Sequence, residues 1–284
     1  QTATTGNLEN AQKIIIASSR YTEEHNAPAM ALIETFTLPK GSKQVTVPKV
    51  GQMSMTDLVD GQDIIDEEEI GMTTVDLTAS EVGAKIILTD KLVRQSSENV
   101  MSIVGRQLGD GMARKKDTDV TALYSGFSTE LGAAARTMSL ANVSAVVAYA
   151  KGNRFGSQVY INHHPFAVWD VANTAVTAST TYPVPKGWTE DLLGDFFSGL
   201  RPLNGVPIFE DGNITIDSSD DAVGVIADKS ALAVLKSVET RTERQRDASL
   251  RATELVMTSD YGVFELDDSK GAALTLDAGT PATS

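Results

Sequence analysis

The chain has 284 residues, 22% of them charged and 41% hydrophobic, which is ordinary for a globular protein long enough to bury a sizeable core. Its 38 acidic and 24 basic residues give a net charge of −14, which argues against general nucleic-acid binding, because such binding depends on Lys and Arg that neutralise phosphates. The absence of cysteine excludes disulfides, cysteine-ligated zinc and cysteine nucleophiles, and no apolar run approaches the roughly 20 residues of a membrane-spanning helix.

The first segment, residues 1–34, predicts an N-terminal arm. A short helix is expected between Asn7, a candidate N-terminal cap, and Pro28, which ends it. A second apolar stretch follows at residues 29–36. Two interpretations stay open: an arm with an apolar face that lies on another molecule, and an ordinary first helix of a compact body.

Residues 37–91 predict a long two-stranded β excursion. Alternating side chains indicate one strand at 45–50 and a second at 72–77 that resumes at 84–88. The intervening residues 56–70 are rich in Asp and Glu, contain no base and show no apolar pattern. Because an isolated two-stranded ribbon is marginal in water, this one should lie on the rest of its own chain or on a neighbouring molecule.

Residues 96–126 predict one long helix. Ser96 or Ser97 can cap its N-terminus, and apolar residues then recur at spacings of three and four. Gly105 and Gly109 lie one turn apart, and each costs about 1 kcal/mol of helix propensity relative to Ala. The two glycines therefore suggest close packing or a bend at that turn.

The remainder of the chain predicts a mixed α/β body followed by a strand-rich end. Helices are expected at 139–150, 165–175, 188–200 and 229–235. Strands are expected at 158–161, 206–210, 223–226, 252–258, 262–266 and 272–276. The densest mixed charge of the sequence lies between Glu239 and Arg251.

The candidates for metal binding are weak. The acids of residues 56–70 could hold calcium, but they lack the spacing of an EF-hand loop, and a solvated or partner-facing loop is favoured. His163 and His164 are adjacent, and adjacent side chains diverge in regular structure, so a turn before Pro165 is favoured over a metal site. Motifs for a nucleophile elbow, a phosphate loop or a dinucleotide site do not occur. We therefore expect no catalytic residue, no cofactor or metal, and no enzymatic activity; an acidic hydrolase is a disfavoured alternative.

Two basic groups are candidates for contact with other molecules. One lies on the long helix between Arg106 and Lys116, and the other lies between Arg241 and Arg251. Nucleic-acid contact is one interpretation, and ion pairs with the acidic loop of a neighbouring subunit are the favoured one, given the net charge. The residues expected to make intersubunit contacts are Lys43, Lys49, Asp57, Asp60, Asp63, Asp66, Glu67, Glu68, Arg241, Arg244 and Arg246.

The order of these segments resembles that of tailed-bacteriophage major capsid proteins with the Hong Kong 97-like fold. Residues 34–50 (ETFTLPKGSKQVTVPKV) look like the start of that family's extended loop. Residues 81–96 (EVGAKIILTDKLVRQS) look like its returning strand, which leads into the spine helix. Residues 261–264 and 272–276 look like its closing strands. The likeness covers nearly the whole chain, although the family has no short diagnostic motif.

The resemblance implies an α+β fold with four parts. They would be an N-terminal arm at 1–34, an extended E-loop at 35–88, a peripheral (P) domain at 89–128 and 236–284, and an axial (A) domain at 129–235. Some members of the family cross-link through a lysine of the E-loop, but nothing in this sequence identifies the partner residues, and no cross-link is predicted.

The resemblance also implies a role. Hexamers and pentamers of the chain would form an icosahedral shell that encloses double-stranded DNA without sequence-specific binding, with portal and scaffolding or decoration proteins as partners and no membrane contact. The protein would belong to the virion and assemble in the cytoplasm of the host bacterium. Two alternatives are a cargo-enclosing compartment shell of the same fold, and a phage tail or surface-attachment protein with an exposed β arm.

Overall fold

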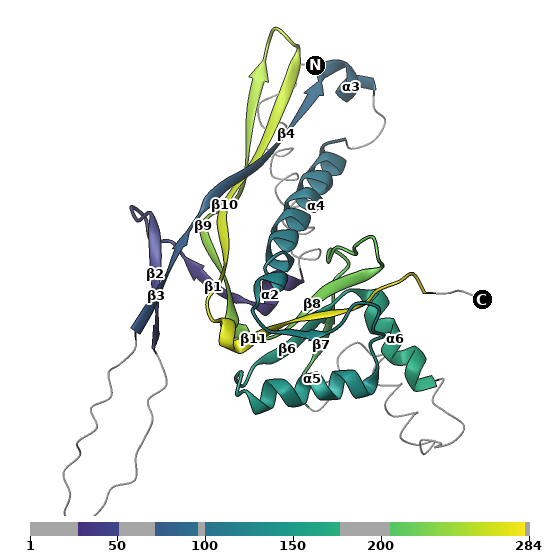
Figure 1. Cartoon of the computed structure of the whole chain (residues 1–284). Helices are drawn as coiled ribbons and strands as arrows, with labels where there is room; N and C mark the ends of the chain where they lie inside the picture. Colours follow the sequence, from purple (N-terminus) through teal and green to yellow (C-terminus); the bar gives the residue numbers. More distant parts are fainter. Residues whose placement is uncertain (1–27, 51–71, 96–99, 177–204, 282–284) are drawn as a thin grey trace, which may run out of the picture.

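The computed structural model describes residues 28–50, 72–95, 100–176 and 205–281, and every structural statement below concerns these residues. They form a four-stranded sheet, a five-stranded sheet and a two-stranded ribbon. In Figure 1 the four-stranded sheet runs toward the top beside a long helix, the five-stranded sheet and its helices lie below, and the ribbon lies to one side.

The N-terminal half of the described chain supplies the ribbon, the outer strands of the four-stranded sheet and the long helix. Its elements in order are α2 (Ala29–Leu32), β1 (Glu34–Thr37), β2 (Gln44–Val50), β3 (Met72–Thr78), β4 (Ser80–Thr89), α3 (Asp90–Gln95) and α4 (Val100–Thr121). Along α4 the buried positions recur at spacings of three and four from Val104 to Thr121, which gives the helix one inward face. The predicted long helix is therefore confirmed, and Gly105 and Gly109 lie on that buried face.

The four-stranded sheet is built on one long hairpin. Strands β9 (Leu232–Asp247) and β10 (Ala252–Glu265) pair antiparallel, β4 adds to β10, and β1 adds parallel to β9. Helix α4 covers one face of this sheet through a small apolar cluster. The cluster consists of Leu88, Val104, Leu108, Met112, Leu255 and Met257.

The five-stranded sheet carries the main hydrophobic core. Its strand order is β5 (Glu130–Gly132), β11 (Gly271–Asp277), β8 (Asp221–Asp228), β6 (Val159–His163) and β7 (Ile208–Glu210). Helices α5 (Leu140–Gly152) and α6 (Pro165–Val176) contribute to the same core. Ser139 caps α5, since its Oγ accepts a hydrogen bond from the Asn142 amide at 3.2 Å. Three short 3₁₀ turns complete the body: Tyr124–Gly126, Lys229–Ala231 and Asp268–Lys270.

The ribbon of β2 and β3 confirms the stem of the predicted excursion. The pairing runs antiparallel from Gln44 opposite Thr78 to Val50 opposite Met72. The expected acidic tip, residues 56–70, lies outside the described residues, as do the helices expected before Pro28 and at 188–200.

One predicted element is wrong. A helix was expected at 229–235, but only Lys229–Ala231 forms a 3₁₀ turn, and strand β9 begins at Leu232. The first four residues of β9 are all buried. A short apolar run buried on both faces has no period that separates helix from strand, and the pairing with β10 decides the outcome. The two strands expected at 252–258 and 262–266 form one continuous strand, β10.

The four expected domain ranges stay predictions, and the sheets show how their residues combine. Strands β1 and β4 lie in the four-stranded sheet, although all their residues except Glu34 and Thr89 belong to the range expected for the E-loop. Strand β11 lies in the five-stranded sheet, although its residues belong to the range expected for the peripheral domain. The two sheets are continuous through the chain where β9 follows β8.

Candidate subunit interface

The ribbon rests on its own chain with one face only. Val45, Val47 and Val75 on that face are half-buried and Leu77 is buried, whereas the alternate positions of both strands are exposed. Met72, at the far end of the described ribbon, is 61% exposed. The ribbon therefore keeps one open face, on which another molecule has room to bind.

Lys49 ties the ribbon to the turn between β10 and β11. Its Nζ lies 2.5 Å from Asp267 Oδ1. Partial burial acts to raise the pKa of Asp267, but the hydrogen bonds from Lys49 and Ser269 outweigh it, and the pKa is lowered. Lys43 is exposed just before β2. Of the two predicted contact lysines, Lys49 thus has a partner within its own chain.

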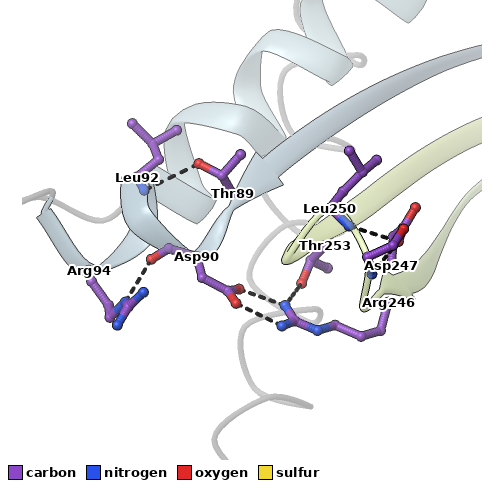
Figure 2. Close-up of polar contacts among 9 residues, drawn as sticks. Thr89, Asp90, Leu92, Arg94, Arg246, Asp247, Leu250 and Thr253 are labelled. Atoms are coloured by element: carbon purple, nitrogen blue, oxygen red, sulfur yellow. Dashed lines mark hydrogen bonds and ion pairs between the residues drawn. The ribbon is translucent and has the colours of Figure 1, made fainter.

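The distal end of the long hairpin is fixed by a bidentate ion pair, drawn in Figure 2. Arg246 Nη1 and Nη2 lie 2.6 Å and 2.7 Å from the two carboxyl oxygens of Asp90, the first residue of α3. The hydrogen bond with Arg246 is the main cause of the lowered pKa of Asp90. The Asp90 amide also donates to the Arg251 carbonyl at 3.0 Å. These contacts join the hairpin end to the β4–α3 corner.

The hairpin turn presents an apolar side chain to solvent. Asp247 Oδ1 accepts hydrogen bonds from the Ser249 amide, the Ser249 hydroxyl and the Leu250 amide at 2.9, 2.7 and 3.1 Å, which orders the turn. Leu250 is 58% exposed. Other exposed large hydrophobic residues lie on the elements at the same end of the sheet: Ile87, Leu92, Val93 and Ile103. Together with Leu250 we call these five residues the distal apolar group.

The predicted contact residues divide between two places. Arg241, Arg244 and Arg246 all lie on β9, and Arg241 Nε contacts Thr258 Oγ1 at 3.3 Å and Glu243 at 3.4 Å. Lys43 lies just before strand β2 of the ribbon, and Lys49 lies near the other end of that strand. The six predicted acids between Asp57 and Glu68 lie outside the described residues. The structure thus brings Arg246 to Asp90 and Lys49 to Asp267, and the intersubunit role of all eleven residues stays a prediction.

Two of the basic residues of α4, Lys115 and Lys116, have partners within the chain. Lys115 Nζ lies 2.6 Å from Asp119 Oδ1. Lys116 is buried, donates to Thr240 Oγ1 at 3.0 Å and lies over the ring of Tyr261 at 5.5 Å from its centroid. These contacts anchor α4 to the four-stranded sheet.

The two adjacent histidines lie where strand β6 ends, with His163 as its last residue and His164 directly after it. The buried His163 ring accepts the His164 amide at Nδ1, 2.9 Å away, and its Nε2 therefore donates to the Leu274 carbonyl at 3.1 Å. Burial lowers the pKa of His163 to about 4, which keeps the imidazole neutral. The turn expected before Pro165 is confirmed by the start of α6. No cluster of three or more His, Asp or Glu suited to a metal ion occurs among the described residues.

The sequence did not predict that acids would be buried, and the two most deeply buried are Asp117 on α4 and Asp211 just after β7. Asp117 had a signal, because it falls on the same helix face as Ala113 and Val120, where apolar residues are expected. Asp211 had none, since an acid after a short strand is ordinary in a surface loop. Among the helices that the structure describes, none is long and apolar enough to cross a membrane.

The structure is similar to solved capsid structures of bacteriophages. The capsid of Helicobacter pylori bacteriophage KHP30, reported as acid-stable, matches with a TM-score of 0.70 and 11% identity over 89% of this chain and 90% of that one. The capsid of Ralstonia phage GP4 matches at 0.67 with 11% identity over 89% of each chain. The capsid of cyanophage P-SCSP1u matches at 0.63 with 14% identity over 87% of each. No protein-family model matches the sequence, and a comparison with curated protein sequences finds no match.

These matches settle the fold. They span nearly all of both chains, and the chain therefore has the α+β fold of tailed-phage major capsid proteins, as the resemblance in sequence implied. At identities of 11–14% they establish the architecture and leave the activity to be argued from the chain itself.

Proposed function

We propose that this chain is the major capsid protein of a tailed bacteriophage, a structural and non-enzymatic protein. Many copies form hexamers and pentamers that close into an icosahedral shell around double-stranded DNA. The observation that carries the proposal is the likeness to solved phage capsids over 87–89% of the chain.

The surfaces of the chain support assembly with copies of itself. The ribbon has one open face, and the distal apolar group lies at the far end of the four-stranded sheet, so the two surfaces are well separated. A subunit with separated contact surfaces can join several neighbours at once, and multivalent closure then makes weak contacts collectively stable. The predicted contacts between Lys43, Lys49 and the β9 arginines of one copy and the acids at 57–68 of another would add to the fit.

The charge of the chain supports enclosure of DNA without tight binding. The net charge is −14, and several basic side chains of the described residues are in ion pairs within the chain: Lys49, Lys85, Lys115, Arg241 and Arg246. A wall of this kind neutralises few phosphates. Portal and scaffolding or decoration proteins would complete the particle, which would assemble in the bacterial cytoplasm and become part of the virion.

Electron microscopy of the purified full-length chain tests the proposal. We expect closed shells of uniform size, and particles isolated from producing cells should contain nuclease-protected DNA. Protein cargo in place of DNA would favour a compartment of the same fold, and tubes or fibres would favour a tail protein. A compact monomer at high concentration would overturn the shell assignment.

A matched pair of variants tests the distal apolar group. Leu250→Asp should abolish shells while the thermal unfolding midpoint of the chain stays close to that of the wild type, because Leu250 is mostly exposed. Val238→Asp places the same charge at an exposed position in the middle of β9 and serves as the control. Equal assembly by both variants would remove the distal apolar group from the interface.

A further inference from the structure

The junction of three elements holds two buried carboxyl groups. Asp117 lies on α4, and Asp211 lies in the turn that follows β7; their exposed fractions are 0% and 1%. Ala29, at the start of α2, reaches the same place. The pair thus joins the first described helix, the long helix and the five-stranded sheet, segments far apart in the sequence.

The hydrogen bonds of the pair account for three of its four oxygens. Asp117 Oδ1 accepts from the Ala29 amide at 3.0 Å, and Asp117 Oδ2 accepts from Asn213 Nδ2 at 2.8 Å. Asp211 Oδ1 accepts from the Asn213 amide at 2.9 Å. Asp211 Oδ2 is buried and has no donor. A buried acceptor without a donor is costly, and a proton on the neighbouring carboxyl would supply the missing donor.

The electrostatics point the same way. Burial and then the hydrogen-bonding contact with Asp211 raise the pKa of Asp117 to about 7. Two carboxylates at hydrogen-bonding distance in a buried site cannot both ionise at low cost. None of the ion pairs among the described residues involves either acid.

The surrounding titratable groups supply no compensating positive charge. Tyr124, whose hydroxyl accepts from Asn162 Nδ2 at 2.8 Å, has a pKa far above its usual value because of burial. His163 and His164 face the turn from β6, and burial lowers the pKa of both rings, so they stay neutral near pH 7. A proton taken up by the acid pair therefore stays between the two carboxyls.

We propose that Asp117 and Asp211 share one proton, and that this proton stabilises the contact between α4 and the turn after β7. Loss of the proton opens that contact. With the proton present, one carboxyl donates to the other across the junction. Without it, two adjacent carboxylates repel, and the turn moves away from α4 so that water reaches Asp211 Oδ2. This pH-dependent contact lies within one chain and does not depend on shell formation.

The sign of the pH effect follows from the raised pKa of Asp117. Between pH 4 and pH 7 the folded chain keeps a proton that the unfolded chain has lost, so this contribution to stability is fully present at low pH and is lost as pH rises through about 7. The neutral buried His163 has the opposite effect, since its lowered pKa costs stability as pH falls below its usual value. A comparison between a variant and the wild type cancels the His163 contribution, whereas Asp211 raises the pKa of His164 against the effect of burial, so His164 can add a smaller difference at low pH.

Asp211→Asn is the sharpest variant. Its amide can donate permanently to Asp117 while its oxygen still accepts from the Asn213 amide, which reproduces the protonated pair at every pH. We expect its thermal midpoint to match the wild type near pH 4.5 and to exceed it by on the order of 5 °C at pH 7.5. Glu81→Gln removes one exposed acid and should show no such pH-dependent difference.

A second variant and a direct readout keep the test decisive. Asp211→Ala also removes the second carboxyl, so its thermal midpoint should fall less than that of the wild type from pH 4.5 to 7.5, which covers the case in which Asp211→Asn fails to fold. Infrared spectra of the unassembled wild type at pH 6 should show the carbonyl band of a protonated carboxyl that Asp211→Asn lacks. The pKa values of Asp170, Glu210 and Glu265 are also raised. Any carbonyl absorption of these three groups occurs in both proteins and cancels in the difference spectrum.

Two results would overturn the proposal: a wild-type minus Asp211→Asn spectrum without that band, or midpoints of the two proteins that run parallel from pH 4.5 to 7.5. Both measurements use single subunits. A negative result would therefore contradict the shared proton without touching the capsid proposal, and an absence of shells would contradict the capsid proposal without touching the shared proton.

Discussion

The five-stranded sheet and the two-stranded ribbon have opposite relations to solvent. In β8, at the centre of the sheet, every residue but Val223 is buried, whereas in β3 of the ribbon only Leu77 is buried. The central strand finds its partners among β6, β11 and the helices of its own chain. The ribbon finds them on one face only, and its other face is exposed.

The difference begins in the sequences of the strands. β8 reads DAVGVIAD, a run of small and β-branched residues that fits a strand covered on both faces. β2 reads QVTVPKV and β3 reads MTTVDLT, in which polar residues alternate with apolar ones, as in a half-covered sheet. Pro48 also lacks a backbone donor, which suits a strand with a free edge.

Truncation at the centre of the five-stranded sheet should have the largest effect. Ile226→Ala removes a side chain that is 0% exposed, and the cavity should lower the free energy of unfolding by about 3–4 kcal/mol. Urea unfolding of the unassembled chain measures the change. A loss below about 1 kcal/mol would mean that the sheet repacks around the vacancy and is not the rigid half of the molecule.

The small cluster under α4 should respond less. Leu255→Ala opens a cavity in a group of only six buried residues, and we expect a loss of about 2 kcal/mol, the low end of the range for such truncations. Hydrogen exchange should accelerate in β9, β10 and α4 while the five-stranded sheet stays protected. Uniform acceleration across both sheets would show that the two cores unfold as one unit.

Changes in the ribbon should affect shell assembly more than they affect the stability of the single chain. Val47→Ala shortens a half-buried side chain, so the free energy of unfolding of the single chain should fall by less than about 1 kcal/mol. Shell yield should fall more in Thr46→Ala, the matched change on the open face, where another copy is expected to bind. A large loss of stability with normal shells would show that the ribbon is part of the body and not an assembly arm.

The sequence predicted the two regions unequally well. Alternation in 45–50 and 72–77 and the period of the long helix depend on local rules, and the structure confirms them. The prediction for the start of β9 was wrong because residues 232–235 are apolar on both faces. The long-range pairing of β9 with β10, in which Ala233 lies opposite Phe264, decided the structure.

The candidate surfaces could be predicted only in part. Arg246 was expected to contact a neighbour, but its partner Asp90 is 156 residues away in the sequence, and no local pattern relates the two. The strand in the charged segment between Glu239 and Arg251 was not predicted. Charged residues alternate there with uncharged polar ones, so the apolar period that marks a strand is absent. Asp117 and Asp211 meet only after three elements have packed, which composition and spacing cannot show.

The ion pair at the distal end should have the smallest effect of the set. Arg246 and Asp90 are both exposed, so solvent screens their attraction, and replacing either by Ala should shift the unfolding midpoint only slightly. The pKa of Asp90 is lowered, so the contribution should be present at neutral pH and disappear as pH falls through that lowered pKa.

Salt provides the comparison that separates this pair from the buried contacts. A double-mutant cycle of Arg246→Ala and Asp90→Ala, measured by urea unfolding, should show a coupling that weakens strongly in about 1 M salt. The Ile226→Ala effect should be unchanged by the same salt after correction for the wild type, since burial excludes the ions. A coupling that resists salt would mean that the bidentate geometry is rigid enough to exclude water, and that the distal end of the long hairpin is as firmly organised as the core below it.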